Sequence, residues 1–94
     1  MMSKIPVDLK KVGKDNLNKE ILRVAVMAEL DAINLYEQLA AATDSKNIKK
    51  VFLDIAKEEK THVGEFQALL LKEDGEQVEE LKHGGKEVDE LIGE

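Results

Sequence analysis

Two apolar stripes at helical spacing constrain the fold of this chain more than any other feature. One lies between residues 17 and 42 and the other between residues 46 and 72, separated by Thr43, Asp44 and Ser45. A helix turns about 100° per residue, so apolar residues three and four positions apart gather on one face. The polar residues between the stripes can end one helix and cap the next. So short a connection predicts two antiparallel helices lying side by side.

The composition agrees with an all-α fold and excludes several kinds of function. Charged residues make up 36% of the 94 residues and aromatic residues 3%, so little favours β-strands. The absence of cysteine excludes disulfides, zinc ribbons, iron–sulfur clusters and thiol nucleophiles. A net charge of −6 argues against nucleic acid or anionic lipid as partners.

No membrane association or secretion is expected from the sequence. No apolar run approaches the roughly 20 residues that span a membrane. Residues 1–11 lack the apolar core of a signal peptide. We therefore expect a cytoplasmic protein without a membrane segment.

The chain divides into a polar N-terminal arm (1–14), a helical hairpin (15–75) and a C-terminal helical tail (76–94). The first helix is expected to begin between Asp15 and Asn18, where several residues can cap it. The second is expected to end at Asp74-Gly75, where the glycine can adopt a left-handed conformation.

The tail is predicted to contain two short helices rather than one. The first would cover residues 76–82 and the second residues 86–92, with His83-Gly84-Gly85 interrupting them. Val88, Leu91 and Ile92 share one face of the second segment, which predicts that it docks against another surface.

The hairpin alone cannot cover all of its apolar side chains. Two helices bury only one seam, but the first helix carries a second apolar row of Ile21, Val24, Ala28, Leu35 and Leu39. We therefore expect a homodimer, at minimum, in which two hairpins form a four-helix bundle.

Glu29 and Glu59 lie in the middle of the apolar stripes. Within about 60° of Glu29 on a helix lie Leu22, Ala25, Val26, Ala32, Ile33, Tyr36 and Ala40. The same window around Glu59 holds Ile48, Phe52, Ile55, Ala56, Val63, Phe66 and Leu70, with His62 beside them. Burying an unpaired carboxylate costs at least several kcal/mol, and no Lys or Arg shares the face near Glu29. The pattern predicts a compensating metal ion.

The donor residues match half of a di-metal carboxylate site. Such sites in helical bundles use one Glu from each of two helices and a Glu-x-x-His from each of the other two. This chain supplies Glu29 and Glu59-x-x-His62, so two copies would complete the set. Carboxylate and imidazole suit iron or manganese and tolerate zinc, and we expect iron.

Other polar residues near the stripes allow two interpretations each. Tyr36 lies two turns beyond Glu29, where it could hydrogen-bond a ligating carboxylate or simply pack. The flanking acids could pass cations to the site or belong to the solvated surface; they are Asp31, Glu37, Glu58 and Glu65. His83 is expected to be exposed and without a function.

At these residues the chain resembles the ferritin-like superfamily, whose helices carry a Glu followed seven residues later by Tyr, and a Glu-x-x-His. It resembles more closely the encapsulated ferritins, half-length rubrerythrin-like members housed inside encapsulin nanocompartments. The similar stretches are AELDAINLYEQLA, KEEKTHVGEFQALL and, in the tail, EQVEELKHGGKEVDEL. The resemblance extends from about Leu17 into the tail.

The resemblance implies a ferroxidase that oxidises iron(II) at a di-iron centre shared between two subunits. It also implies dimers that assemble into a larger ring, commonly a decamer, with the encapsulin shell protein as a partner. Glu29, Glu59 and His62 match the family's iron ligands. Tyr36 matches its neighbouring tyrosine, and Asp31 an acidic position on its iron access route.

The chain departs from the family's pattern at two positions and leaves two other functions open. Many members have an acid where this chain has Ala28, and a tryptophan where it has Leu35. A rubrerythrin-like peroxidase or hydroxylase would use the same ligands, but the chain has no cysteine for the electron-transfer site of such peroxidases. The other alternative is a metal-free helical dimerisation or adaptor module.

Overall fold

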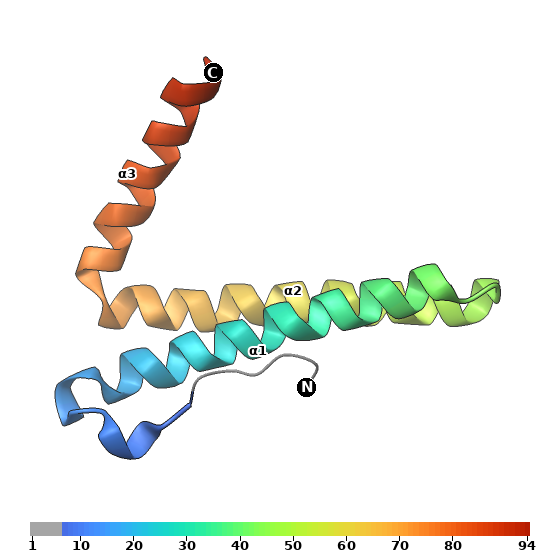
Figure 1. The fold of residues 1–94 in the computed structure, drawn as a ribbon, viewed down its shortest axis with the longest axis horizontal. Coiled ribbons are helices and arrows are strands. Elements are labelled where there is room, and N and C mark those ends of the chain that lie inside the picture. The colour runs from blue at the N-terminus through green and yellow to red at the C-terminus, as the bar shows by residue number, and fades with distance from the viewer. Residues whose placement is uncertain (1–6) are drawn as a thin grey trace.

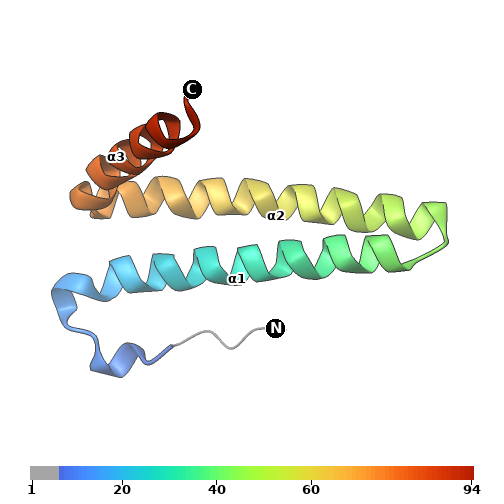
Figure 2. The ribbon, with the colours of Figure 1, turned by 45° about the horizontal axis from the view of Figure 1, so that its top comes forward.

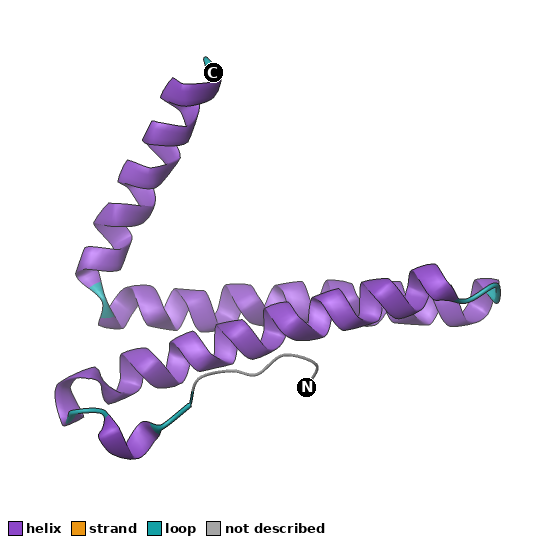
Figure 3. Cartoon of the chain, viewed as in Figure 1, coloured by secondary structure: helices purple, strands orange, loops and turns teal. Residues whose placement is uncertain are grey.

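The computed structural model describes residues 7–94, and the regular structure within that range is entirely helical (Figures 1 and 3). A short 3-10 helix, η1 (Leu9–Lys11), is followed by α1 (Lys14–Ala42), α2 (Lys46–Glu73) and α3 (Gly75–Ile92). The all-α prediction is confirmed. In the described range, no helix is both long enough and apolar enough to cross a membrane.

Helices α1 and α2 form the predicted antiparallel hairpin and lie side by side along most of their lengths (Figure 2). The connection is stabilised by its own polar side chains. Ser45 Oγ accepts a hydrogen bond from the Ile48 N–H at 3.2 Å, which caps α2, and Thr43 Oγ1 accepts one from the Ser45 N–H at 3.1 Å. Since the turn is centred on Asp44, residues equally distant from it along the chain lie at about the same level of the two helices.

The core of the hairpin is a narrow seam. Its buried apolar residues are Ile33, Ala40, Ala56 and Leu70. Many larger apolar side chains in the described range remain exposed on the flanks of both helices, including Ile21, Met27, Leu30, Leu39, Ile48, Val51 and Leu53. A single hairpin therefore leaves much apolar surface in contact with water, as expected for a chain whose helices pack against further helices. The dimer itself remains a prediction.

Helix α3 leaves the end of α2 and points away from the hairpin (Figures 1 and 2). The predicted interruption at His83-Gly84-Gly85 is wrong, because α3 is continuous from Gly75 to Ile92. Each glycine costs about 1 kcal/mol in a helix, but the flanking Glu, Leu and Lys residues favour one. Asp74 also caps the first turn, where its side chain accepts a hydrogen bond from the Gln77 N–H.

Two predicted helix ends also need correction. Helix α1 begins at Lys14, with Gly13 as its N-cap, one residue before the expected range. Gly75 does not end α2 in a left-handed conformation; it is the first residue of α3, and Asp74 alone separates the two helices. The left-handed glycine is Gly93, with φ of 77°, which ends α3.

Candidate metal centre

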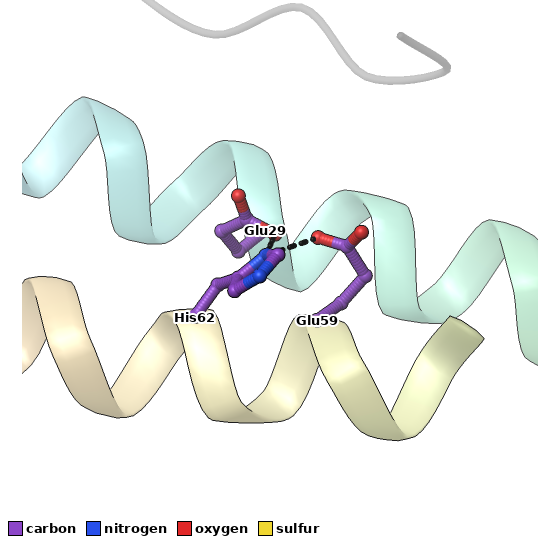
Figure 4. A group of neighbouring side chains, drawn as sticks. All are labelled: Glu29, Glu59 and His62. Atoms are coloured by element: carbon purple, nitrogen blue, oxygen red, sulfur yellow. Dashed lines mark hydrogen bonds and ion pairs between the residues drawn. The ribbon is translucent and has the colours of Figure 1, made fainter. Parts of the chain in front are cut away.

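Glu59 and His62 lie one turn apart on α2 and point to the same side (Figure 4). Glu59 Oε2 is 3.4 Å from His62 Nδ1. Residues three positions apart are neighbours on a helix surface, so this arrangement follows from the local sequence alone.

Glu29 reaches the same point from α1 (Figure 4). Its Oε2 atom is 3.5 Å from His62 Nδ1. One ligand atom from each of Glu29, Glu59 and His62 lies within 4.8 Å of the other two. The turn explains the encounter, since Glu29 and Glu59 are each fifteen residues from Asp44. The structure therefore brings together the three predicted ligands.

The negative charge of the two glutamates favours the binding of a cation at this site. Glu29 Oε2 is buried and has no hydrogen-bond partner. In the described part of the chain neither Glu29 nor Glu59 pairs with a Lys or Arg; the ion-pair contact of each is with His62. A buried carboxylate oxygen without a partner is costly, and a divalent ion would compensate it. Two carboxylates and an imidazole are donors that iron, manganese and zinc all accept.

The site is partly open rather than enclosed. The Glu29 and Glu59 side chains are each 19% exposed, whereas that of His62 is 45% exposed. The glutamates are therefore less buried than their position in the stripes suggested, because a two-helix hairpin covers only one side of each stripe. This open side is where further ligands could approach.

Tyr36, two turns beyond Glu29 on α1, makes an aromatic contact. Its ring stacks on Phe52 across the hairpin, with ring centroids 6.0 Å apart and planes 22° from parallel. Both residues are eight positions from Asp44, so the register that aligns the glutamates also aligns the rings. Sequence analysis placed Phe52 in the apolar stripe but did not identify this pairing. Equal spacing from the turn is the signal that could have predicted it.

The flanking acids lie outside the group of converging ligands. Asp31 is half-buried and is not one of the three side chains whose ligand atoms meet. Glu37 is half-exposed and pairs with Lys60 at 3.1 Å, which favours the solvated-surface interpretation for that residue. Glu58 and Glu65 are exposed.

A comparison with known families decides where this chain belongs. The profile of the rubrerythrin family matches residues 20–91, which include all three converging ligands and nearly all of α3. The chain belongs to the rubrerythrin family.

Two relatives place it more narrowly within that family. The ferritin-like-encapsulin shell fusion protein of Pyrococcus furiosus is 64% identical over 74 residues, covering 79% of this chain and 21% of that protein. The encapsulin nanocompartment cargo protein EncC of Myxococcus xanthus is 38% identical over 61 residues, covering 65% of this chain and 47% of that protein. This chain thus corresponds to about a fifth of the first relative and about half of the second.

A solved structure supports the same placement. The crystal structure of the encapsulated ferritin domain from Pyrococcus furiosus superposes with a TM-score of 0.85 at 52% sequence identity. The superposition covers all of this chain and 98% of the chain in the crystal structure. The resemblance to the encapsulated ferritins is confirmed.

Proposed function

We propose that this rubrerythrin-family protein is a ferroxidase, which oxidises iron(II) to iron(III) at a di-iron centre shared between two copies. One observation carries the proposal. Glu29 Oε2 is buried without a hydrogen-bond partner at the point where Glu59 and His62 also converge. A cation is the natural partner for this oxygen, and the three donors suit iron.

The second copy follows from the number of ligands and from the open side of the site. One chain offers three ligand side chains, whereas a bundle-type di-iron centre uses a Glu from each of two helices and a Glu-x-x-His from each of the other two. Two hairpins facing each other across the open side would together supply that set once. They would also cover exposed apolar residues of α1 and α2. Dimers would then assemble further, and we expect a decameric ring.

Iron(II) is the substrate in this proposal. Glu29 and Glu59 hold the ions and provide negative charge that favours the iron(III) product over iron(II), and His62 supplies a neutral donor. Each iron(II) ion loses one electron. Two ions together supply the two electrons that, with two protons, reduce one dioxygen to hydrogen peroxide. We assign Tyr36 the support of a ligating carboxylate, and Asp31 a role in iron access.

The iron(III) product would need a separate storage compartment. The four described elements form an open hairpin with one projecting helix, and they enclose no chamber that could hold mineral (Figure 1). The names of both relatives associate them with encapsulins. We therefore propose that this protein works as cargo inside an encapsulin shell, for iron storage or detoxification.

Iron binding and turnover test the proposal together. The protein is soaked anaerobically with iron(II), its structure is determined with anomalous scattering, and its aerobic oxidation rate is measured without any reductase. We expect two iron positions between two copies, bound by Glu29, Glu59 and His62, and oxidation with dioxygen as the acceptor. Faster turnover with hydrogen peroxide would favour the peroxidase alternative. If iron neither binds nor changes the oligomeric state, the enzyme interpretation fails and the adaptor module is favoured.

A further inference from the structure

Asp74 forms the junction between all three long helices. It is the buried charged residue of the described chain, and it alone separates α2 from α3. Its Oδ2 atom accepts a hydrogen bond from Arg23 Nη2 of α1 at 2.8 Å. Its Oδ1 atom accepts one from the Gln77 N–H at 3.1 Å, and its own N–H donates to Leu70 O at 2.9 Å. The Asp74 side chain therefore links the N-terminal end of α3 to α1.

Little else ties α3 to the hairpin. Gln77 and Val78, in its first turn, are half-buried, but every residue from Glu79 to Glu94 is exposed. Figures 1 and 2 show the helix leaving the hairpin with no element beside its outer part. Within the described range, packing contributes little to the direction of α3, because only Gln77 and Val78 of the helix are half-buried.

The three contacts of Asp74 have different consequences. Those with Leu70 and Gln77 join residues within four positions, so they end α2 and begin α3 without setting the angle between them. The contact with Arg23 spans 51 positions and reaches the neighbouring helix. It is a charge-assisted bond to a carboxylate only 9% exposed, and such bonds are stronger and better oriented than neutral ones.

We propose that the Arg23–Asp74 pair is a latch that holds α3 in one direction relative to the hairpin. With the latch closed, α3 presents six acids, two lysines and the exposed apolar residues Val88, Leu91 and Ile92 in a fixed orientation. Fixing a surface in advance lowers the entropic cost of any contact it makes. With the latch open, α3 would pivot about Asp74. This inference does not depend on the proposed iron chemistry.

The absence of cysteine makes the latch directly testable. Lys50→Cys and Glu90→Cys place spin labels on exposed positions of α2 and α3, and pulsed electron resonance measures the distance distribution between them. Labelled chains are diluted with unlabelled ones so that only distances within one chain are recorded. We expect one narrow distribution in the otherwise unchanged chain, and a broader, shifted one after Arg23→Gln. An unchanged distribution after Arg23→Gln overturns the proposal.

Two controls separate a latch from general loosening. Lys60→Gln removes a lysine–glutamate ion pair between α1 and α2, the 3.1 Å contact with Glu37, and should leave the distribution unchanged. Labels at Gln38 and Glu58 report on the hairpin itself. If Arg23→Gln also changes the distance between the labels at Gln38 and Glu58, the Asp74→Asn variant is used to test the latch instead. This variant keeps a side-chain oxygen for the Gln77 N–H but loses the charge. Broadening then supports the latch, and an unchanged distribution contradicts it.

Discussion

Helices α2 and α3 each carry a glutamate followed three residues later by a histidine, and the two pairs have the same local geometry. Glu59 Oε2 and Glu80 Oε2 both lie 3.4 Å from Nδ1 of the histidine one turn further on, His62 or His83. The surroundings differ. The first pair meets a carboxylate from another helix, that of Glu29, whereas His83 faces Glu87 of its own helix at 3.2 Å.

Burial separates the two pairs as well. Glu59 is 19% exposed, whereas Glu80 is 64% exposed, so water solvates the second carboxylate and no cation is needed to compensate it. The Glu-x-x-His spacing is therefore not a metal centre by itself. The first pair also meets a carboxylate from a second helix, and Oε2 of that carboxylate is buried without a hydrogen-bond partner. The predictions below test this contrast.

Removing Glu59 should have the largest effect. Glu59→Ala is expected to abolish rapid iron(II) oxidation, a loss greater than the roughly 10- to 100-fold typical of groups that only support a metal ligand. The measurement is the initial rate of iron(III) formation in air. Glu80→Ala is the matched control on α3, and its rate should equal that of the unchanged chain. Equal losses in both variants would mean that the centre has been placed wrongly.

Tyr36→Phe should have an intermediate effect. It preserves the stack on Phe52 but removes the hydroxyl, so the rate of iron(II) oxidation should fall about tenfold if that hydroxyl supports a carboxylate ligand. Phe52→Leu is the companion variant, since it alters the stack and keeps the hydroxyl. A Tyr36→Phe enzyme at full rate would show that Tyr36 only packs.

Glu29→Gln should stabilise the metal-free protein but reduce the stabilisation that iron(II) provides. In metal-free protein, the neutral amide removes a negative charge whose Oε2 atom is buried without a hydrogen-bond partner, so the free energy of unfolding should rise by about 1 kcal/mol. With iron(II) present the variant should gain less stability than the unchanged chain, because a ligand has been lost. Chemical denaturation with and without iron(II) measures both, with Glu80→Gln as the solvated control. A metal-free variant that is less stable would contradict the interpretation of Glu29.

The smallest expected effect is on stability at low pH. It concerns the buried Asp74 at the start of α3, in contrast to the exposed residues further along that helix. The hydrogen bond from the Gln77 N–H is the main cause of the lowered pKa of Asp74. Burial acts in the opposite direction and raises this pKa, whereas the Arg23 side chain and the charge of Lys19 lower it further. A carboxyl whose pKa is lowered by folding stabilises the protein above its unfolded pKa of about 4, and this contribution disappears as the pH falls through the folded value.

The unfolding free energies of the unchanged chain and Asp74→Asn should therefore differ at neutral pH and converge below about pH 4. Denaturant titrations at a series of pH values measure this difference. The Glu80→Gln variant should follow the unchanged chain throughout. A constant difference for Asp74→Asn at all pH values would show that its charge is not what stabilises the junction.

Local patterns in the sequence predicted most of the fold and the ligands of the candidate centre. The helical stripes, the three-residue connection and the Glu-x-x-His spacing act over a few turns, where helix geometry fixes which residues are neighbours. The errors occurred where local signals compete. Gly84 and Gly85 lie inside a continuous α3, because favourable neighbours and a capped first turn outweigh the cost of two glycines.

The sequence by itself determined that there are two helices with glutamates in their apolar stripes, and that Glu59 and His62 share a face. Only the tertiary structure decided that Glu29 meets them, that Glu59-x-x-His62 differs from Glu80-x-x-His83, and that Arg23 reaches Asp74. The physical reason is that helical periodicity fixes the direction of a side chain around its own axis but not its partner on another helix. Partners depend on the turn that sets the register and on which faces remain exposed.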